Sequence, residues 1–512
     1  MSGRRLPARP SLDHLKHESR ALHRAFEQGD AAAMARVTAV LGARTALKLT
    51  EAQRVVAREY GFANWARLRA HVQASRGIDD AIDAFLSAVE SQDRGRATQV
   101  LSAEPRIVKS SLHVAAVLGL EGEVRGLIAR NPAAVRERVG SSPADPLLWL
   151  CYSPFHGESR ERDEGLFACA RALLDAGADP GTKDARHGVP ALYAVTGVHN
   201  VPRIARLLLE AGATPNDGES VFHAAERFHV ESLELLREFG ADLNLVGEWG
   251  NTPLYFLLRY WEVGKMPDMQ RGLLWLLEHG ADPNVRCGRQ QESALHVAVR
   301  RRQDLRIIRW LLDHGAEVNA PRGDGRTPWV LARRSGSDAM VKLLEEAGAT
   351  RQPLTAEDRL VEACARGDEA TAALLTSADL VDALDTESLQ LLSEAARRDA
   401  VSVVRACLTA GFPVDTPDEI GSTALHQASI AGRAAVVREL LRHGADFRIK
   451  DREHHSSPLG WACFGADMQI EPEGTYEDTV QALLEAGARP DPGEHLPSHP
   501  GVAGVLRAFD TT

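Results

Sequence analysis

Four histidines occur at matching places along the chain and are the first residues that could do acid–base chemistry. Each lies within a short phrase of the type SALHVAV, and the four are His113, His223, His296 and His426. Catalysis by such a group requires a nucleophile, a second base or a metal at a defined spacing. The sequence has no Gly-rich phosphate loop, no G-x-S-x-G and no H-E-x-x-H. We therefore expect no catalytic residue and no enzyme.

The sequence also contains no set of metal-ligating residues at a suitable spacing. The six cysteines are dispersed without C-x-x-C spacing, at Cys151, Cys169, Cys287, Cys364, Cys407 and Cys463. This pattern indicates free thiols in a reducing compartment and argues against a disulfide scaffold or a zinc site. His454 and His455 adjoin without a third ligand at the right spacing, and the acidic segment from Ile470 lacks the ligand order of an EF-hand. We expect no metal and no cofactor.

Arginine recurs at one position of the repeated phrases, immediately after their small-residue pair. The arginine column comprises Arg227, Arg259, Arg300, Arg301, Arg334, Arg366, Arg397 and Arg398. Guanidinium groups pair bidentately with carboxylates and phosphates, so a line of them would suit an acidic protein segment. The helix dipole also favours a cation at a helix C-terminus, and this second explanation stays open.

Aromatic residues outside the apolar stripes are the other candidates for partner contact. Trp249 lies in the polar stretch LVGEWGN, while Tyr260 and Trp261 begin an inserted segment. Exposed aromatic side chains are frequent hot spots of interfaces. The tryptophans within apolar stripes are expected in the core instead, at Trp149, Trp275, Trp310 and Trp329.

A second recurring phrase shows which elements must position these residues. It reads LLDAGADP from Leu173, LLEHGADPN from Leu276, LLEEAGAT from Leu343 and LLRHGADF from Leu440, with further copies between them. Self-similarity at a period of roughly 33 residues is typical of a stack of identical helix pairs. One such pair cannot bury its apolar face alone, so each repeat requires neighbours.

Together the two phrases resemble the ankyrin repeat, whose signature is T-P-L-H-x-A followed by L-L-x-x-G-A-D-x-N. The resemblance covers roughly residues 79 to 490 and is strongest in TPWVLARRSGSDAMVKLLEEAGA, residues 327–349. It implies an all-α solenoid of paired antiparallel helices with hairpin-like loops. It also implies that the four histidines make hydrogen bonds within and between repeats, and that the arginine column lines the concave groove.

The strongest copy makes physical sense from its residues alone. Thr327 is a natural N-cap, and Pro328 suits the first turn of a helix, where its missing N–H would be unpaired anyway. Leu343 and Leu344 continue an apolar stripe at helical spacing. Gly348 then occupies the position where a left-handed C-cap is needed.

We predict five segments along the chain. Residues 1–10 form a tail, 11–76 a helical cap or separate module, 79–144 divergent repeats, 145–490 the repeat array and 491–512 a C-terminal cap or tail, with a linker at 75–80. Three repeats carry insertions, which begin after Leu150, Tyr260 and Phe464. Insertions in repeat arrays map to loops on one face, often a binding face.

The N-terminal region and the composition bear on the source of the chain. The phrase AREYGFANWARLRAHV resembles a leader found in bacterial ankyrin proteins of undefined role. With arginine far above lysine and abundant alanine, we expect a bacterial protein. The formal net charge of −11 argues against wholesale nucleic-acid binding. There is no signal peptide and no apolar run of membrane-helix length, so we expect a cytoplasmic monomer.

These observations favour a non-catalytic scaffold that binds a protein partner, with an acidic segment as the expected ligand. The contact residues would be the groove arginines and exposed aromatics, assisted by loop tips and insertions. Three alternatives stay open: a catalytic role for the N-terminal module, a regulatory subunit or arm of an enzyme complex, and an exported effector that acts on host proteins.

Overall fold

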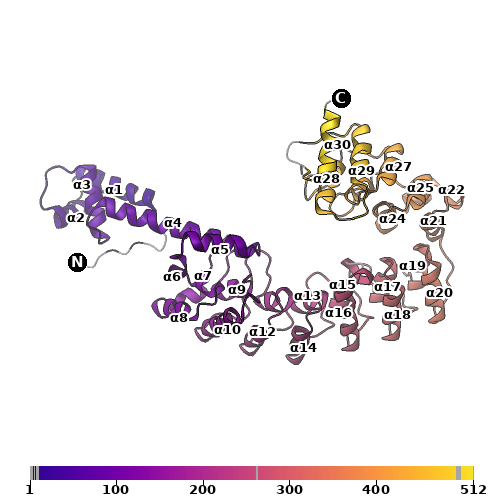
Figure 1. Ribbon diagram of the computed structural model, residues 1–512, viewed down its shortest axis with the longest axis horizontal. Helices are drawn as coiled ribbons and strands as arrows, with labels where there is room; N and C mark the ends of the chain where they lie inside the picture. The colour runs from indigo at the N-terminus through magenta and orange to yellow at the C-terminus, as the bar shows by residue number, and fades with distance from the viewer. Residues whose placement is uncertain (1–3, 5, 7–10, 261–262, 492–496, 511–512) are drawn as a thin grey trace. The chain divides into compact units, whose positions relative to one another are not determined.

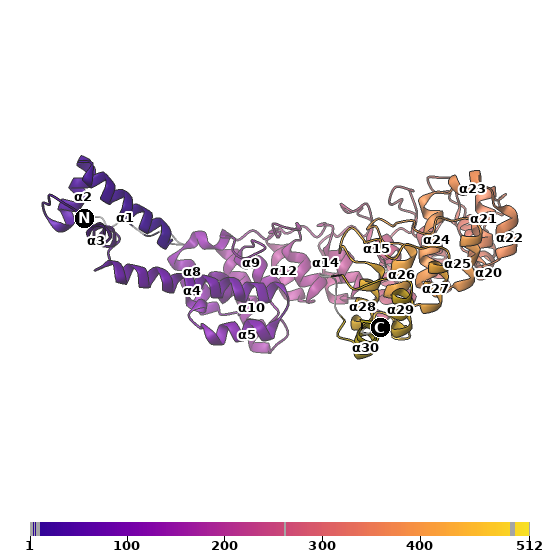
Figure 2. The ribbon, with the colours of Figure 1, turned by 90° about the horizontal axis from the view of Figure 1, so that it is seen from above.

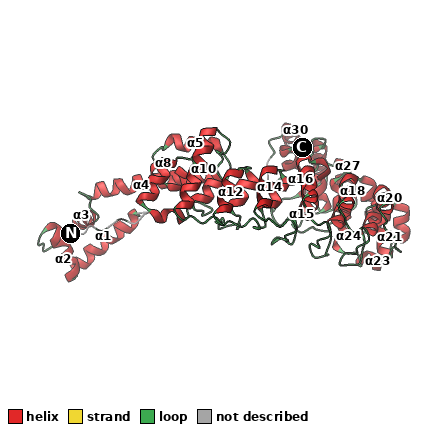
Figure 3. Ribbon diagram, turned by 90° about the horizontal axis from the view of Figure 1, so that it is seen from below, coloured by secondary structure: helices red, strands yellow, loops and turns green. Residues whose placement is uncertain are grey.

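Helices and the loops between them make up the computed structural model, which describes residues 4, 6, 11–260, 263–491 and 497–510 (Figure 3). Within these residues there is no β-strand, and the only bridges are the isolated pairs Val139–Ala144, Lys183–Pro190 and Cys287–Glu292. The chain divides into two compact units, Met1–Glu248 and Trp249–Thr512. The predicted all-α fold is confirmed, while the division falls inside the stretch that we expected to form one array.

The first unit begins with a small helical module that has its own apolar core. Its helices are α1 (Leu12–Glu27), α2 (Ala31–Leu41), α3 (Leu49–Glu59) and the start of α4 (Trp65–Glu90) (Figure 1). Leu15, Leu22, Val37, Val55 and Leu68 are among the buried side chains of this core. Each of α1, α2 and α4 begins at a Ser, Asp or Asn whose side chain accepts a backbone N–H, so local capping chemistry sets these starts.

Helix α4 corrects the linker expected at residues 75–80. It runs without a break from Trp65 to Glu90, with Leu68 and Val72 in the core of the module and Phe85 and Leu86 buried further along. The segment QASRGIDD contains no proline, and one glycine inside a helix costs only about 1 kcal/mol relative to alanine. Polar composition alone therefore does not end the helix.

The remaining helices of the first unit form two rows. Short helices α7, α9, α11 and α13 follow one another on one side, and the longer α8, α10, α12 and α14 pack in series on the other. The bounds are α5 Arg94–Ala103, α6 Ile107–Ser110, α7 Leu112–Val117, α8 Glu121–Arg130, α9 Pro146–Cys151, α10 Arg160–Asp175, α11 Ala191–Tyr193, α12 Pro202–Glu210, α13 Ser220–Glu226 and α14 Val230–Glu238. Two irregular turns, η1 (Pro132–Arg136) and the π-helical η2 (Ala194–Val198), complete this unit.

The second unit repeats the same two-row plan and is closed by a terminal helix. The inner row is α15 (Pro253–Tyr260), α17 (Ala294–Arg300), α19 (Pro328–Arg334), α21 (Ala356–Ala365), α24 (Thr386–Arg397), α26 (Ala424–Ile430) and α28 (Pro458–Met468). The outer helices are α16 (Pro267–Glu278), α18 (Leu305–Asp313), α20 (Asp338–Glu346), α22 (Glu369–Leu375), α25 (Val401–Thr409), α27 (Ala434–Arg442) and α29 (Tyr476–Glu485). Short turns η3 (Val263–Lys265) and α23 (Ala378–Asp382) lie between them, and α30 (Pro500–Asp510) packs on α29 and buries Val502.

Local residue choices explain why each helix pair ends where it does. Gly348 follows α20 with φ +91°, and Gly280 follows α16 with φ +98°, a region that L side chains rarely adopt. The equivalent glycines at Gly177, Gly212, Gly240, Gly315, Gly411, Gly444 and Gly487 all have positive φ as well. The predicted left-handed C-caps are confirmed. Pro328 opens α19 as predicted, although its N-cap Thr327 makes no side-chain capping bond.

Candidate partner-binding surface

The arginine column lies at the C-terminal ends of the inner helices, as the sequence predicts. Arg300 and Arg334 end α17 and α19, and Arg227, Arg301, Arg366 and Arg398 are C-cap residues. Arg259 is in the last turn of α15. The structure therefore gives these cations a common local environment, and what distinguishes them is the group that each one contacts.

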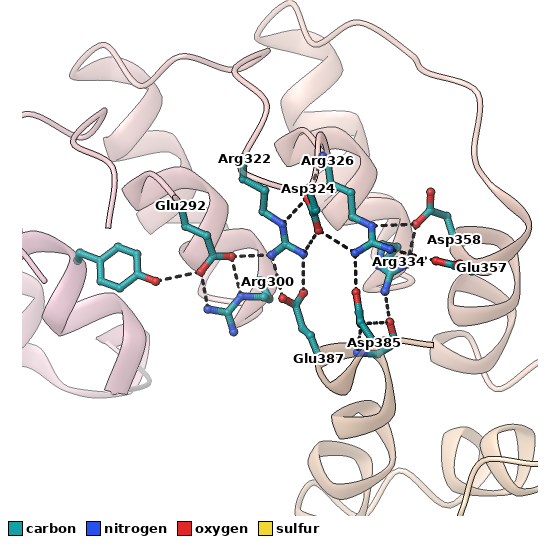
Figure 4. Close-up of polar contacts among 12 residues, drawn as sticks. Glu292, Arg300, Arg322, Asp324, Arg326, Arg334, Glu357, Asp358, Asp385 and Glu387 are labelled. Atoms are coloured by element: carbon teal, nitrogen blue, oxygen red, sulfur yellow. Dashed lines mark hydrogen bonds and ion pairs between the residues drawn. The ribbon is translucent and has the colours of Figure 1, made fainter. Parts of the chain in front are cut away.

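Arg322, from the loop that precedes α19, is the centre of an ion-pair network that the column joins (Figure 4). Its side chain is 0% exposed. One guanidinium nitrogen lies 2.7 Å from Glu292 and 2.9 Å from Glu387, and the other lies 2.8 Å from Asp324. Three carboxylates thus compensate one buried cation, which explains how a fully buried guanidinium is tolerated.

Glu292 is the carboxylate that links this loop to the column. Arg300 binds it through two hydrogen bonds of 2.9 and 2.8 Å, and the hydroxyl of Tyr255 donates to it at 2.9 Å. Burial alone would raise the pKa of Glu292, but the hydrogen bonds and charges of Arg300 and Arg322 outweigh burial and lower that pKa to about 2. Glu292 is ionised at any physiological pH and neutralises Arg300.

Arg334 and Arg326 form the other half of the network. Arg334 is buried and donates to Asp358 at 2.6 Å and to the Ser388 hydroxyl at 2.5 Å. Arg326 lies 2.8 Å from Asp385 and 3.2 Å from Asp358. We call the whole set the arginine–carboxylate cluster, and its members are Glu292, Arg300, Arg322, Asp324, Arg326, Arg334, Glu357, Asp358, Asp385 and Glu387.

The cluster spans more of the chain than ordinary contacts between repeats. Arg322 and Glu387 are 65 residues apart, whereas the ion pair Arg206–Glu238 of the outer row joins residues 32 apart. The repeat between them is the degenerate one, in which α21 begins at Ala356, soon after Gly348. Because this repeat has no long loop of its own, the loop before α19 meets the start of α24 directly.

The rest of the arginine column also meets partners within the chain. Arg366 lies 3.2 Å from Glu362, Arg301 lies 3.6 Å from Glu394, and Arg398 lies 4.0 Å from the same carboxylate. Arg227 donates to the Val198 carbonyl at 3.4 Å, and Arg259 lies beside the Tyr255 hydroxyl. The uncompensated positive stripe expected from the sequence is therefore corrected: the carboxylates of the fold neutralise most of it, and whether any member contacts a partner stays a prediction.

Trp249 keeps the exposure that its sequence context predicts. It lies in the loop between α14 and α15, and 81% of it is exposed. Tyr260 ends α15, but its side chain and all of Trp261 lie outside the described residues. Trp149, Trp275 and Trp329 are buried and Trp310 is half-buried, in agreement with their expected core roles.

The insertions are packed into the fold more than their polar composition indicates. Phe155, in the first, is buried and lies 5.9 and 5.6 Å below the guanidinium groups of Arg94 and Arg162. Tyr476, after the third, is also buried and donates its hydroxyl to the Ile430 carbonyl at 3.1 Å. The end of α28, next to the third insertion, does leave apolar side chains in solvent, with Met468 61% and Phe464 41% exposed.

The recurring histidines make structural hydrogen bonds. His426 bonds with Thr423 at 3.0 Å inside its repeat and with the Ser456 carbonyl at 3.3 Å in the next, and His113 bonds with the Glu137 carbonyl at 2.8 Å. His296 bonds with Ser293 at 2.6 Å. His223 differs, because it lies between Glu219 and Glu226. In the part of the chain that the structure describes, no group of three or more His, Cys, Asp or Glu could hold a metal ion.

One surface feature was missed by the sequence analysis. A groove of about 480 Å³ lies on the outer helices α10, α12 and α14, with Phe167 between Arg171 at 4.8 Å and Arg203 at 4.3 Å. Ion pairs Arg203–Glu164 and Arg206–Glu238 border it. The sequence feature that could have predicted this groove is the alternation of Arg and Glu on the polar faces of these helices.

None of the described helices is long and apolar enough to cross a membrane.

Comparisons with known proteins agree with this geometry. Family models described as ankyrin repeats match residues 221–260, 265–352, 360–451 and 392–493, together just over half of the chain. A human ankyrin repeat and SOCS box protein 16 is 30% identical over 309 residues, which is 59% of this chain and 54% of that protein. A human SH3 and multiple ankyrin repeat domains protein 2 is 34% identical over 110 residues, 20% of this chain and 6% of that protein.

Solved structures of ankyrin repeat domains are also similar. That of human ASB11 is 24% identical with a TM-score of 0.35 and covers 48% of this chain and 99% of that one. That of Bcl-3 is 25% identical with a TM-score of 0.23 and covers 48% of this chain and 93% of that one. The chain spans about half the length of the first curated relative. The two relatives described above are human proteins, so they give no support to the bacterial source expected from composition.

Proposed function

Because the chain belongs to the ankyrin-repeat family, we propose that it is a non-catalytic scaffold that binds a protein partner. Stacked repeats present an extended surface, and arrays of one fold bind unrelated targets through different surface residues. All six cysteines are buried thiols outside any disulfide, which suits a reducing compartment, so the proposed location is the cytoplasm. The partner must be inferred from the exposed chemistry of this particular array.

The exposed Trp249 is the observation that carries the proposal. A tryptophan in solvent leaves a large apolar surface unburied, and such residues are the most frequent anchors of protein interfaces. The loop position suits this role, because a loop residue can contact a partner without disturbing the core. We assign Trp249 as the anchor of the partner contact.

An acidic segment of the partner is a poorer ligand for the arginine column than the sequence indicates. The cluster holds four arginines and six carboxylates, a formal charge of −2. A ligand carboxylate would have to displace Glu292 from Arg300 or Asp358 from Arg334, and each displaced acid would stay buried with one cationic partner fewer, Arg322 or Arg326 alone. We therefore reserve the acidic-ligand role for arginines at the edge of the column, of which Arg398 is one.

Affinity capture from the native cell with matched variants tests this proposal. The variants are Trp249→Ala and Leu374→Ala, the second of which removes an equally exposed apolar side chain, 86% exposed, from α22. We expect the same protein to be captured by the parent and by Leu374→Ala, and its affinity for Trp249→Ala to fall about 30-fold, as for a hot spot worth about 2 kcal/mol. Equal affinity of both variants would remove Trp249 from the interface.

A further inference from the structure

Charge is distributed very unevenly along this chain. Residues 1–76 hold 14 Lys and Arg against 6 Asp and Glu, a formal charge of +8, so the other 436 residues carry −19 of the total of −11. The N-terminal module is thus a basic body attached to an acidic array. Such asymmetry indicates a polyanionic partner for the basic part.

Two carboxylates of the module, Glu18 and Glu59, lie between its helices and contact arginines there. Arg36 binds Glu59 through hydrogen bonds of 2.9 and 2.7 Å and lies 3.3 Å from Glu18, whose other oxygen accepts from the Tyr60 hydroxyl at 3.2 Å. Arg4 contacts the same two acids. Two of the six acids are therefore neutralised between the helices. Two more cap helix starts, since Asp30 accepts from Ala33 and Glu51 from Lys48.

Four arginines on the outside of the module have no such compensation, whereas Lys16 and Arg44 pair with Asp13 and Glu51. Arg20 and Arg24 on α1, and Arg54 and Arg58 on α3, are exposed, and no described carboxylate pairs with them. Each pair is four residues apart, so its two guanidinium groups share one helix face about 6 Å apart along the axis. Arg67 and Arg69 add two exposed cations at the start of α4.

Among negatively charged partners, the phosphates of a nucleic-acid backbone fit these arginine pairs better than an anionic membrane or an acidic protein segment does. A membrane-binding helix needs a free apolar face, but that of α1 is buried in the module core through Leu15 and Leu22. An acidic protein segment needs an apolar anchor, and the described large hydrophobic side chains exposed on the module are Met34 and Leu49, 42% and 39% exposed. Phosphate contacts need only distributed cations, and the guanidinium fork matches phosphate geometry.

The acidic array does not cancel this surface. Val72, the last residue of the module core, and Ile82, the next residue described as buried, are ten positions apart in α4, which is about 15 Å of helix at 1.5 Å per residue. The Debye length at physiological ionic strength is about 8 Å, so array charges beyond it are largely screened. Figure 2 shows α1–α3 gathered at the N-terminal end of α4.

We propose that the N-terminal module binds nucleic acid through its phosphate backbone, by means of the arginine pairs on α1 and α3. This revises the expectation drawn from the whole-chain charge, which averages a basic module with an acidic array. It is independent of the protein partner proposed for the array. The chemistry recognised is the phosphate backbone, and RNA and DNA are the two sources that an experiment must separate.

Fluorescence anisotropy of the full chain with labelled nucleic acid tests the proposal. The probes are a duplex DNA of roughly 20 base pairs and a single-stranded RNA of similar length, titrated between about 50 and 200 mM NaCl. The variant changes Arg20, Arg24, Arg54 and Arg58 to Gln. The matched control changes four exposed array arginines to Gln, at Arg130, Arg309, Arg359 and Arg438.

We expect the parent and the control to bind at least one probe, with log K falling steeply against log salt. The module variant should bind at least about tenfold more weakly. On duplex DNA its salt slope should be shallower by about 3.6, because each phosphate that an arginine no longer neutralises reduces the slope by about 0.9. The slope of the parent is independent of how any variant folds. Equal binding by variant and control, or no binding of either probe by the parent at about 50 mM salt, would overturn the proposal.

Discussion

Replacement of Arg322 by Met would test whether the arginine–carboxylate cluster holds neighbouring repeats together. Methionine keeps much of the side-chain volume but removes a cation whose side chain is 0% exposed. Breaking a buried ion pair by removing one partner costs about 3–5 kcal/mol, because the remaining charge is left buried. The structure favours the lower end of that range.

Three contacts decide the magnitude for Arg322→Met. Glu292 loses one cation but keeps Arg300 at 2.8 Å. The side chains of Glu387 and Asp324 are 28% and 23% exposed, so water can partly replace the missing guanidinium. We therefore expect a decrease of about 3 kcal/mol in the local opening free energy.

Hydrogen exchange measured by mass spectrometry is the appropriate assay, because repeat arrays open locally. A decrease of about 3 kcal/mol corresponds to exchange roughly 150-fold faster, since every 1.4 kcal/mol is tenfold. The faster amides should lie in α17, α19 and α24, whereas those of α28 should be unchanged. The control is Arg306→Met, whose ion pair with Asp304 is 61% and 39% exposed and should be worth at most about 1 kcal/mol. Parent-like exchange in Arg322→Met would refute a structural role for the cluster.

Two further predictions concern acid and close packing. The pKa of Glu292 and that of Asp385 are both lowered to about 2, against burial, by neighbouring arginines and, for Asp385, by Ser388. The two ionised carboxylates stabilise the fold above the unfolded pKa near 4, and this stabilisation is lost as pH falls towards about 2. Hydrogen exchange in α17 and α24 should therefore accelerate between about pH 4.5 and 2. An exchange rate that shows no such acceleration over this pH range would contradict the prediction. Gly165→Ala would place a Cβ 2.2 Å from the Gly119 carbonyl oxygen and should destabilise the first unit by about 1–3 kcal/mol in urea unfolding. The control Gly126→Ala, with open space around the added Cβ, should be neutral or stabilising. Equal urea midpoints for the two variants would contradict the packing argument.

The features of the fold that local sequence determines could be predicted. Gly348 requires a left-handed backbone, Pro328 fits only a helix start, and the apolar stripes give the inner and outer helices. The extent of α4 could not be predicted in the same way. A polar segment with one glycine is compatible with either a linker or a helix, and burial at both ends of α4 decides between them.

The surface was predicted less well, for a physical reason. A repeat period assigns Arg300 and Arg334 the same position, but it does not show which carboxylates approach them from elsewhere. The partner that matters most, Glu387, is 65 residues from Arg322 and lies across a degenerate repeat. Exposure of Trp249 was predictable because a polar loop offers no core in which to bury it. Segregation of charge was visible in the sequence, but the total of −11 conceals it.

The hydrogen-exchange footprint of the purified complex between the full chain and its captured partner tests the central claim most directly. That claim places the partner on the exposed loop surface around Trp249, and it treats the arginine–carboxylate cluster as internal structure. We predict slower exchange on partner binding in the loop between α14 and α15, with exchange in α17, α19 and α24 unchanged. Protection confined to α17, α19 and α24, with none in the Trp249 loop, would contradict the account.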